Sequence, residues 1–159
     1  MAGMPMDLAN DFRDLLGTFI EHDVRFLVVG GYALAVHGRP RATGDLDVWI
    51  DATRANAERA YAALRSFGAP LHDLRVEDLA TPGVVFQIGI VPLRIDVLTS
   101  ASGIAFDPAF SRRVEAPFDG LRVPVLGRDD LIANKRATGR LQDLADLEVL
   151  TGVAKPREK

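Results

Sequence analysis

Three acidic residues lie where a folded chain could use them for chemistry. Asp45 and Asp47 belong to segment 45–50, where polar and apolar residues alternate as they do in a strand with one buried face. Residues i and i+2 of a strand point to the same side, so the two carboxylates can bind one Mg²⁺ and hold a second ion nearby. Asp96 lies between two apolar residues in another predicted strand. Paired ions of this kind clamp the attacking and leaving oxygens in phosphoryl transfer.

Chance and structural pairing are the alternative interpretations of these acids. The chain has 16 Asp residues, so about one acid-x-acid pattern is expected without any function. Asp96 could also form a structural ion pair with Arg94 or another arginine, because an acid within an apolar strand is costly unless it is exposed or paired. The joint pattern is rarer than its parts, so we expect the three acids to meet at one site.

A double glycine precedes the acid pair. Gly30 and Gly31 separate the predicted buried strand 25–29 from a short helix at 32–37. Without side chains the backbone can approach a phosphate, although a strand-to-helix turn also requires glycine for steric reasons. The sequence has no P-loop, no G-x-G-x-x-G and no G-x-S-x-G motif. Its three dispersed histidines and its lack of cysteine argue against a zinc site.

Length and composition indicate one globular domain. With 159 residues, 48% of them hydrophobic, the chain can bury a core, and we place a single domain at 1–154 before a solvated tail at 155–159. The formal net charge of −3 argues against a protein that coats nucleic acid. No apolar run approaches the roughly 18 residues that span a bilayer, and the acidic first segment is unlike a signal peptide. A cytoplasmic protein is expected.

Hydrophobic periodicity predicts helices alternating with strands. The expected helices are one that begins after Asp7, then 32–37, one from Thr53 to Gly68, and two from 128 onward, interrupted at 138–139. The expected strands are 25–29, 45–50, 84–90, 93–98, 114–117 and 121–125, with a hairpin signal at 119–120. The predicted fold class is α/β (α+β), a mixed sheet flanked by helices with further helices at the C-terminal end, since hairpins exclude a purely parallel sheet.

The last predicted helices carry both an apolar and a charged pattern. We expect an apolar seam formed by Leu141, Leu144, Leu147 and Leu150. The spacing of helix-face charge pairs predicts an intramolecular network, rather than catalysis, for Arg140, Asp143 and Asp146. Rings beside a sheet usually pack rather than stack on a base, and we expect packing for Tyr32, His37 and Trp49.

The sequence resembles the nucleotidyltransferase superfamily with the DNA polymerase β-like fold in two segments, VVGGYALAVHGRPRATGDLDVWI (28–50) and RIDV (94–97). Within the superfamily it looks like the small bacterial members related to the AbiEii-type toxin nucleotidyltransferases. The closing LGRDDLIANKRATGRLQDLADLEVL is similar to the helical end of that group. The resemblance covers about residues 24–151, nearly the whole chain.

The resemblance implies a nucleotidyltransferase fold and a role for each matching residue. Gly30 and Gly31 are expected to contact the triphosphate, and Asp45 and Asp47 to bind Mg²⁺ or Mn²⁺. Asp96 is expected to complete the metal site or to act as the base toward the acceptor hydroxyl. Many members have Ser where this chain has Gly31. The change removes one phosphate contact and leaves the backbone amides.

Three further residues have two interpretations each. Arg41 and Thr43 come just before the acid-bearing strand and could contact the substrate phosphate or order their loop. Lys135 lies on a predicted helix, where it could neutralise the β- or γ-phosphate or be an ordinary surface lysine. The resemblance raises the weight of phosphate binding for Lys135 without deciding between its two interpretations, and all three residues are candidates for nucleotide binding.

The function expected from these residues is metal-dependent transfer of an NMP from an NTP to an acceptor hydroxyl, by a two-metal mechanism. The acceptor stays open between an RNA or tRNA end, a protein side chain and a small molecule, and a role in a toxin–antitoxin pair is compatible with each. The second hypothesis is a catalytically inactive nucleotide-binding or antitoxin-like interaction module. A third is a structural α/β domain with no site, for which Mg²⁺ should not change the melting temperature.

Overall fold

The fold is a six-stranded mixed sheet with helices on both faces. The computed structural model describes residues 8–38, 44–90 and 93–152. The sheet has the order β3-β4-β2-β1-β6-β5. Its strands are β1 (Phe26–Val29), β2 (Asp45–Ile50), β3 (Val85–Ile90), β4 (Leu93–Leu98), β5 (Val114–Phe118) and β6 (Leu121–Val125). The predicted fold class is confirmed, and each predicted strand lies within one residue of its expected bounds.

Helices connect and cover the strands. They are α1 (Leu8–Glu21), α2 (Gly30–Val36), α3 (Arg54–Phe67), α4 (Val76–Leu79), α5 (Phe106–Ser111), α6 (Arg128–Thr138) and α7 (Leu141–Thr151). Local signals explain their ends: the Thr53 side chain accepts a hydrogen bond from the backbone N–H of Asn56 at the start of α3, and Gly68 ends that helix. The predicted helices are confirmed, whereas α4 and α5 were not predicted, since four and six residues are too few for a helical period.

Strand directions differ across the sheet. β2 runs parallel to β4 and antiparallel to β1, and β1 runs parallel to β6. The two edge strands, β3 and β5, are antiparallel to their neighbours. The β5–β6 turn places both Asp119 and Gly120 at positive φ, as the predicted hairpin requires. The parallel β2–β4 pair at the centre is the part that positions the candidate site.

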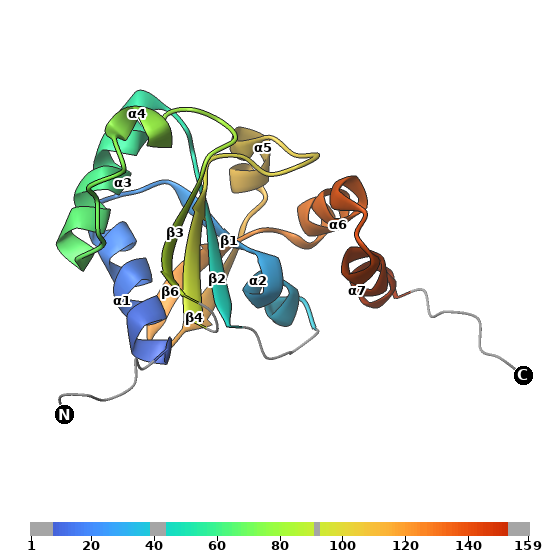
Figure 1. Cartoon of the computed structure of the whole chain (residues 1–159). Helices are drawn as coiled ribbons and strands as arrows, with labels where there is room; N and C mark the ends of the chain where they lie inside the picture. The colour runs from blue at the N-terminus through green and yellow to red at the C-terminus, as the bar shows by residue number, and fades with distance from the viewer. Residues whose placement is uncertain (1–7, 39–43, 91–92, 153–159) are drawn as a thin grey trace, which may run out of the picture.

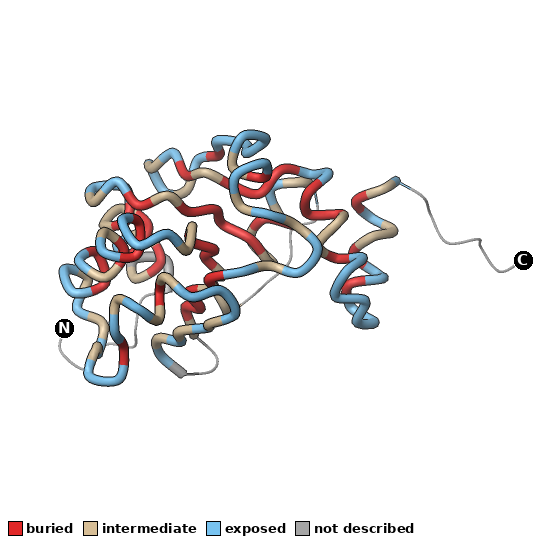
Figure 2. The backbone as a smooth tube through the Cα atoms, turned by 90° about the horizontal axis from the view of Figure 1, so that it is seen from above, coloured by how far each residue is buried: buried red, intermediate tan, exposed pale blue. Residues whose placement is uncertain are grey.

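Two helical layers cover the two faces of the sheet (Figure 1). On one side α1 and α3 pack over the inward residues of β2, of which Leu46, Val48 and Ile50 are fully buried. On the other side lie α2, α5, α6 and α7, so the alternate residues of β2 face a different environment. Buried residues follow the central strands in Figure 2, while the helices expose their outer faces. The acids of β2 therefore point away from the main core.

The prediction of an apolar seam along α7 is wrong for its first two leucines, Leu141 and Leu144. Leu141 is 87% exposed and Leu144 is 48% exposed, whereas Leu150 is 2% exposed. The buried side of α7 instead carries Asp143 and Asp146, which meet a lysine of α6. A charge cluster therefore takes the place that the leucine spacing indicated for an apolar contact.

Within the described residues, no helix combines the length and apolarity needed to cross a membrane.

Candidate active site

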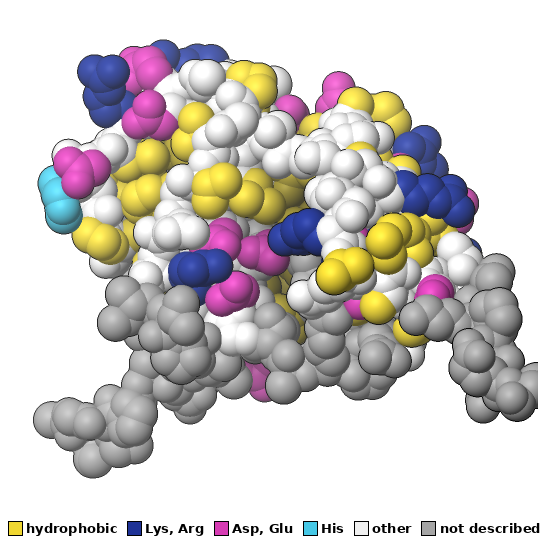
Figure 3. Space-filling model, turned by 45° about the vertical axis from the view of Figure 1, so that its right-hand side comes forward, with side chains coloured by type: hydrophobic (Ala, Val, Ile, Leu, Met, Phe, Trp, Pro, Cys, Tyr) yellow, Lys and Arg dark blue, Asp and Glu magenta, His cyan; other side chains and the backbone are white. Residues whose placement is uncertain are grey.

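The register of β2 and β4 brings the three predicted acids together. In this parallel pair Asp45 lies opposite Arg94, and Asp47 lies opposite Asp96. Directly paired residues share a face of the sheet, and so do residues two apart on one strand. The four side chains therefore form a square, the acid square, on the face that carries α2. In Figure 3 a group of acidic side chains lies beside basic ones on one face of the molecule.

Arg94 is the cation within the acid square. Its Nη2 donates a hydrogen bond to Asp45 Oδ2 at 3.2 Å, and its Nε lies 3.1 Å from Asp96 Oδ1. The second contact is an ion pair without hydrogen-bond alignment, since neither Arg94 Nε nor Asp96 Oδ1 has a hydrogen-bond partner within the described chain. The sequence offered a site role or an Arg94 ion pair for Asp96. The structure has the ion pair and also places Asp96 beside Asp47.

The glycine turn lies directly against Asp47. Gly30 has a φ of +70°, and a Cβ built at Gly30 would stand 2.2 Å from Asp47 Oδ2 and 3.0 Å from its Cγ. Only glycine avoids both the left-handed strain and this overlap. Gly31 follows as the second residue of α2. The sequence predicted a glycine turn near the acids, and tertiary contact explains why the first position has no side chain.

Two acids of the square have raised pKa values. Burial, followed by the charges of Asp96 and Asp45 and a hydrogen bond with Asp96, raises the pKa of Asp47 to about 7. Burial also raises the pKa of Asp96, against the opposing effect of Arg94. Both shifts arise first from burial, and the charges of neighbouring carboxylates add to it. Perturbed acids of this kind are typical of functional sites.

The donor chemistry of the square fits a hard divalent cation. Carboxylate oxygens are the ligands that Mg²⁺ prefers, and Asp96 presents a buried oxygen without a hydrogen bond. Among residues 8–38, 44–90 and 93–152, however, no group of three or more His, Cys, Asp or Glu is arranged to hold a metal ion. Arg94 is in contact with two of the three acids. The square therefore has the right donors, with a guanidinium among them.

A second charge cluster joins α6 to α7. Lys135 Nζ lies 3.2 Å from Asp143 Oδ1 and 2.9 Å from Asp146 Oδ2, and only 7% of the lysine side chain is exposed. Arg140 Nε donates to Asp143 Oδ2 at 2.7 Å, and Thr138 Oγ1 donates to the same oxygen at 2.6 Å. The predicted intramolecular network is confirmed. Lys135 is not the ordinary surface lysine that was one of its two interpretations, and its phosphate role stays a prediction.

At Asp143 the hydrogen-bond donors have a larger effect on the pKa than burial has. Burial raises the pKa of this carboxyl, yet hydrogen bonds from Arg140, Thr138 and Lys135 together hold it well below its usual range. Asp143 is therefore charged at all ordinary pH values. It fixes Lys135 on the buried side and Arg140 on the exposed side of the cluster.

Arg140 is the functional candidate that sequence reasoning missed. Its side chain is 74% exposed, and its charge interacts with that of Asp47. The guanidinium thus lies within electrostatic reach of the acid square while Asp143 holds its inner edge. The helix-face spacing alone indicated only the pairing with Asp143. A residue between two helices can also face a distant strand, which sequence spacing does not reveal.

The other predicted residues are accounted for in two ways. Arg41 and Thr43 lie outside the described residues, so their roles stay predictions. The predicted packing of the rings is confirmed: Trp49 meets Phe106 edge-on at 5.0 Å, and Tyr32 contacts Phe12 and Phe118. His37 Nε2 donates a hydrogen bond to the carbonyl oxygen of Leu126 at 2.8 Å.

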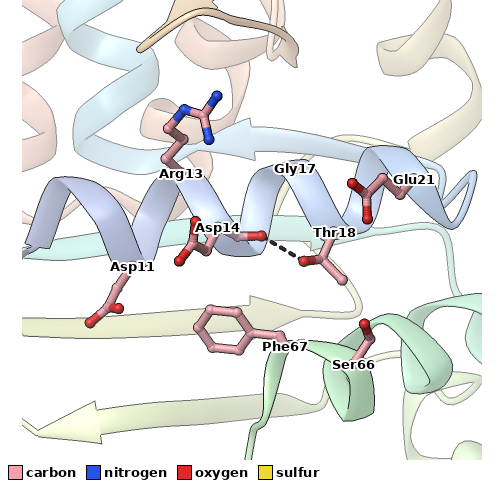
Figure 4. Close-up of a pocket in the computed structure, with 8 residues that line it drawn as sticks. All are labelled: Asp11, Arg13, Asp14, Gly17, Thr18, Glu21, Ser66 and Phe67. Atoms are coloured by element: carbon pink, nitrogen blue, oxygen red, sulfur yellow. Dashed lines mark hydrogen bonds between the residues drawn. The ribbon is translucent and has the colours of Figure 1, made fainter.

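Two cavities lie away from the acids. One of about 370 Å³ between α1 and α3 is lined mainly by polar groups of α1, and Thr18 there bonds the carbonyl oxygen of Asp14 (Figure 4). It lies on the sheet face opposite the acid square. A second, largely apolar cavity of about 680 Å³ lies between α2 and the β5–β6 hairpin and is lined by Tyr32, Val36 and Phe118 among others. It shares α2 with the glycine turn.

Comparison with known protein families gives one match over most of the chain. Residues 6–153 match the family described as "Nucleotidyltransferase of unknown function (DUF6036)". The chain belongs to this nucleotidyltransferase family. The superfamily expected from the sequence is therefore confirmed, while the AbiEii-related subgroup stays a prediction. A search of curated proteins found no match to the sequence.

Solved structures of nucleotidyltransferases share the fold. A Thermotoga maritima protein described as a nucleotidyltransferase is 13% identical, with a TM-score of 0.59 over 90% of this chain and 89% of its own. The lincosamide antibiotic adenylyltransferase LnuA, solved with lincomycin, is 13% identical, with a TM-score of 0.58 over 91% of this chain and 97% of its own. ANT(2")-Ia with adenylyl-2"-tobramycin is 13% identical, with a TM-score of 0.63 over 92% and 89%. At this identity the likeness shows the fold.

Replacing Gly30 by Ala is expected to displace Asp47 and destabilise the protein. The new Cβ adds its overlap with Asp47 to the left-handed strain at φ +70°. Gly152→Ala is the matched control, because Gly152 has φ +72° and nothing within 4 Å of an added Cβ. We expect a loss of about 1 kcal/mol in the free energy of unfolding for Gly152→Ala and about 3 kcal/mol for Gly30→Ala. Equal losses in urea denaturation would contradict the contact.

Stability without divalent ions is expected to fall as pH rises through the pKa of Asp47. The folded pKa of about 7 exceeds the ordinary value of 3.8 for an aspartate, so the fold favours the protonated acid. That contribution is complete below about pH 4 and is lost by about pH 8, whereas an Asn at this position does not titrate. Because one pKa unit corresponds to about 1.4 kcal/mol, the stability of Asp47→Asn relative to the wild type should rise by about 4 kcal/mol between these pH values. A difference between Asp47→Asn and the wild type that does not change with pH would contradict the raised pKa.

Lys135→Met is expected to destabilise the α6–α7 pair strongly. It leaves Asp143 and Asp146 buried without their ammonium partner, which costs about 3–5 kcal/mol in comparable pairs. Arg136→Met, on the exposed side of α6, should change the free energy of unfolding by less than about 0.5 kcal/mol. An unchanged urea midpoint for Lys135→Met, together with a raised KM for NTP, would support the phosphate role instead.

Proposed function

We propose that this nucleotidyltransferase moves an NMP from an NTP to an acceptor hydroxyl, with Mg²⁺ or Mn²⁺ held by Asp45, Asp47 and Asp96. The observation that supports this most is the β2–β4 register, which pairs Asp47 with Asp96 beside the glycine turn. Membership of a nucleotidyltransferase family supports the reaction class. The proposal extends to a cytoplasmic role for the protein as one component of a toxin–antitoxin pair.

The surroundings of the acid square supply the groups that bind a triphosphate. The backbone at Gly30 lies against Asp47, and Gly31 follows at the start of α2, so no side chain of these two residues would separate the backbone from a phosphate. Arg140 adds an exposed guanidinium within electrostatic reach of Asp47. Arg41 and Thr43 precede β2 in the chain and complete the proposed phosphate contacts, and Lys135 is a further candidate from the C-terminal cluster. Positive charge near the transferred group lowers the barrier because negative charge develops there.

The reaction forms one bond to phosphorus and breaks another. The acceptor oxygen attacks the α-phosphorus in line while the bond to pyrophosphate breaks, and the acceptor proton passes to Asp96. A bound divalent ion supplies positive charge at the phosphates and lowers the pKa of the acceptor hydroxyl. Asp45 and Asp47, both on β2, would supply carboxylate ligands for the divalent ion. A carboxyl with a raised pKa, such as Asp96, is suited to accept a proton near neutral pH.

The acceptor class is open between an RNA end, a protein side chain and a small molecule. Two proteins with this fold are described as a lincosamide adenylyltransferase and as ANT(2")-Ia bound to adenylyl-2"-tobramycin, which supports inclusion of small hydroxyl compounds. The apolar cavity between α2 and the β5–β6 hairpin offers a surface for such a compound.

One observation favours a second candidate, a nucleotide-binding module without turnover. Arg94 contacts both Asp45 and Asp96, so two of the three acids already have a cation. A module that binds NTP but does not transfer NMP would keep this arrangement. Calorimetry with NTP and Mg²⁺, followed by a transfer assay on the same sample, separates the two candidates.

Asp47→Asn is expected to abolish transfer while the protein stays folded. The protein is incubated with Mg²⁺ or Mn²⁺ and α-labelled NTP, in turn with total RNA, with a protein extract and with hydroxyl-bearing antibiotics. Transfer to one acceptor class should fall at least about a thousandfold in the variant, because the carboxylate beside the glycine turn is lost. Asp107→Asn, which removes an exposed carboxylate, should retain activity. Transfer that survives Asp47→Asn rejects the proposed site.

A further inference from the structure

The acid square combines three negative charges with the positive charge of Arg94. Three carboxylates and one guanidinium lie on one face of two paired strands, so the four charges sum to −2 when all are ionised. One divalent ion would make the sum zero, and two would make it +2. The arginine therefore supplies half of the positive charge that one divalent ion would bring to the square.

Arg94 lies where a shared cation is most effective. Its two nitrogens reach Asp45 on β2 and Asp96 on β4, at 3.2 Å and 3.1 Å, so the guanidinium bridges the two acid-bearing strands. The side chain is 27% exposed and that of Asp96 is 11% exposed, which limits screening by water. The contact to Asp96 lacks hydrogen-bond alignment. A poorly aligned pair can be given up for a better cation at small cost.

We infer that Arg94 is a built-in stand-in cation that holds the acid square together without metal and competes with a divalent ion for Asp45 and Asp96. The inference rests on the proposed function, since it assigns a regulating role at the same site. Metal binding has to release at least one of the two Arg94 contacts. The freed guanidinium then faces the side of the sheet from which a triphosphate would approach.

This competition has a direct consequence for the order of binding. Free divalent ion binds weakly in the absence of nucleotide, because Arg94 already neutralises two of its ligands. A triphosphate offers Arg94 a new anionic partner and brings additional oxygen ligands for the ion. Metal and nucleotide therefore bind better together than separately, and Arg94 carries the coupling between them.

Removing Arg94 is expected to tighten metal binding rather than weaken it. Mn²⁺ binding without nucleotide is measured by calorimetry, and by the electron paramagnetic resonance signal of the unbound ion, for the wild type and for Arg94→Gln. The variant should bind Mn²⁺ at least about tenfold more tightly, because a competing charge has left its ligands. It should also melt at a lower temperature than the wild type without Mn²⁺, and Mn²⁺ should raise its melting temperature by more than that of the wild type.

Two further variants make the test decisive. Arg54→Gln removes the same charge from an exposed pair with Glu58 and should change Mn²⁺ affinity less than about twofold. Arg94→Lys keeps one positive charge without the two-strand bridge and should give an intermediate affinity; it decides the question if Arg94→Gln does not fold. An equal or weaker Mn²⁺ affinity in a folded Arg94 variant overturns the inference.

The proposed function is judged by a different measurement. Transfer of labelled NMP by the wild-type protein is assayed in parallel. Transfer by the wild type, combined with unchanged Mn²⁺ affinity in the Arg94 variants, leaves the enzyme intact and rejects only the stand-in cation. Tighter Mn²⁺ binding in Arg94→Gln without any transfer by the wild type supports the stand-in cation and favours the module over the enzyme.

Discussion

The parallel pairing of β2 with β4 is the constraint on which the site depends. Its register places Asp47 beside Asp96 and Asp45 beside Arg94, and a shift by one residue would send Asp96 to the opposite face. The core fixes that register, because the alternate residues Leu46, Val48, Ile95 and Val97 are 0–4% exposed on the other face. Apolar burial on one side of the sheet thus determines which charges meet on the other. The three acids are therefore brought together by apolar packing on the opposite face of the sheet, in which they take no part.

The buried Asp143 and the half-buried Asp47 have pKa shifts in opposite directions. Asp143 receives hydrogen bonds from three side chains and has a lowered pKa, whereas Asp47 faces two other acids and has a pKa raised to about 7. Burial acts in the same direction on both, so the donors decide the sign. Asp143 supports the fold, and Asp47 stores unfavourable charge that a cation would relieve. The neighbours of the two carboxylates, rather than burial alone, thus determine the direction of their pKa shifts.

The C-terminal helices place Lys135 and Arg140 in different surroundings. Lys135 points into the α6–α7 contact and is held by Asp143 and Asp146, while Arg140 is anchored by Asp143 and remains largely exposed. Contact between Lys135 and an incoming phosphate would have to weaken its pairing with these two carboxylates, which is costly at a buried site. The guanidinium, with several donors, can keep one edge on Asp143 and present another to solvent. The cluster therefore buries the lysine and leaves much of the arginine exposed.

Local sequence determined the strands, the main helices, the hairpin and the set of candidate acids, because alternation, capping residues and turn residues act over a few positions. The sequence could not determine α4 and α5, which are too short for a period, or the exposure of Leu141, since charge pairing rather than leucine spacing orients α7. Only the tertiary structure decided that Asp96 joins Asp45 and Asp47, that Gly30 contacts Asp47 and that Arg94 bridges two strands. Each of these contacts joins residues far apart in the chain, and strand order and register, which bring them together, are set by the packing of the whole core.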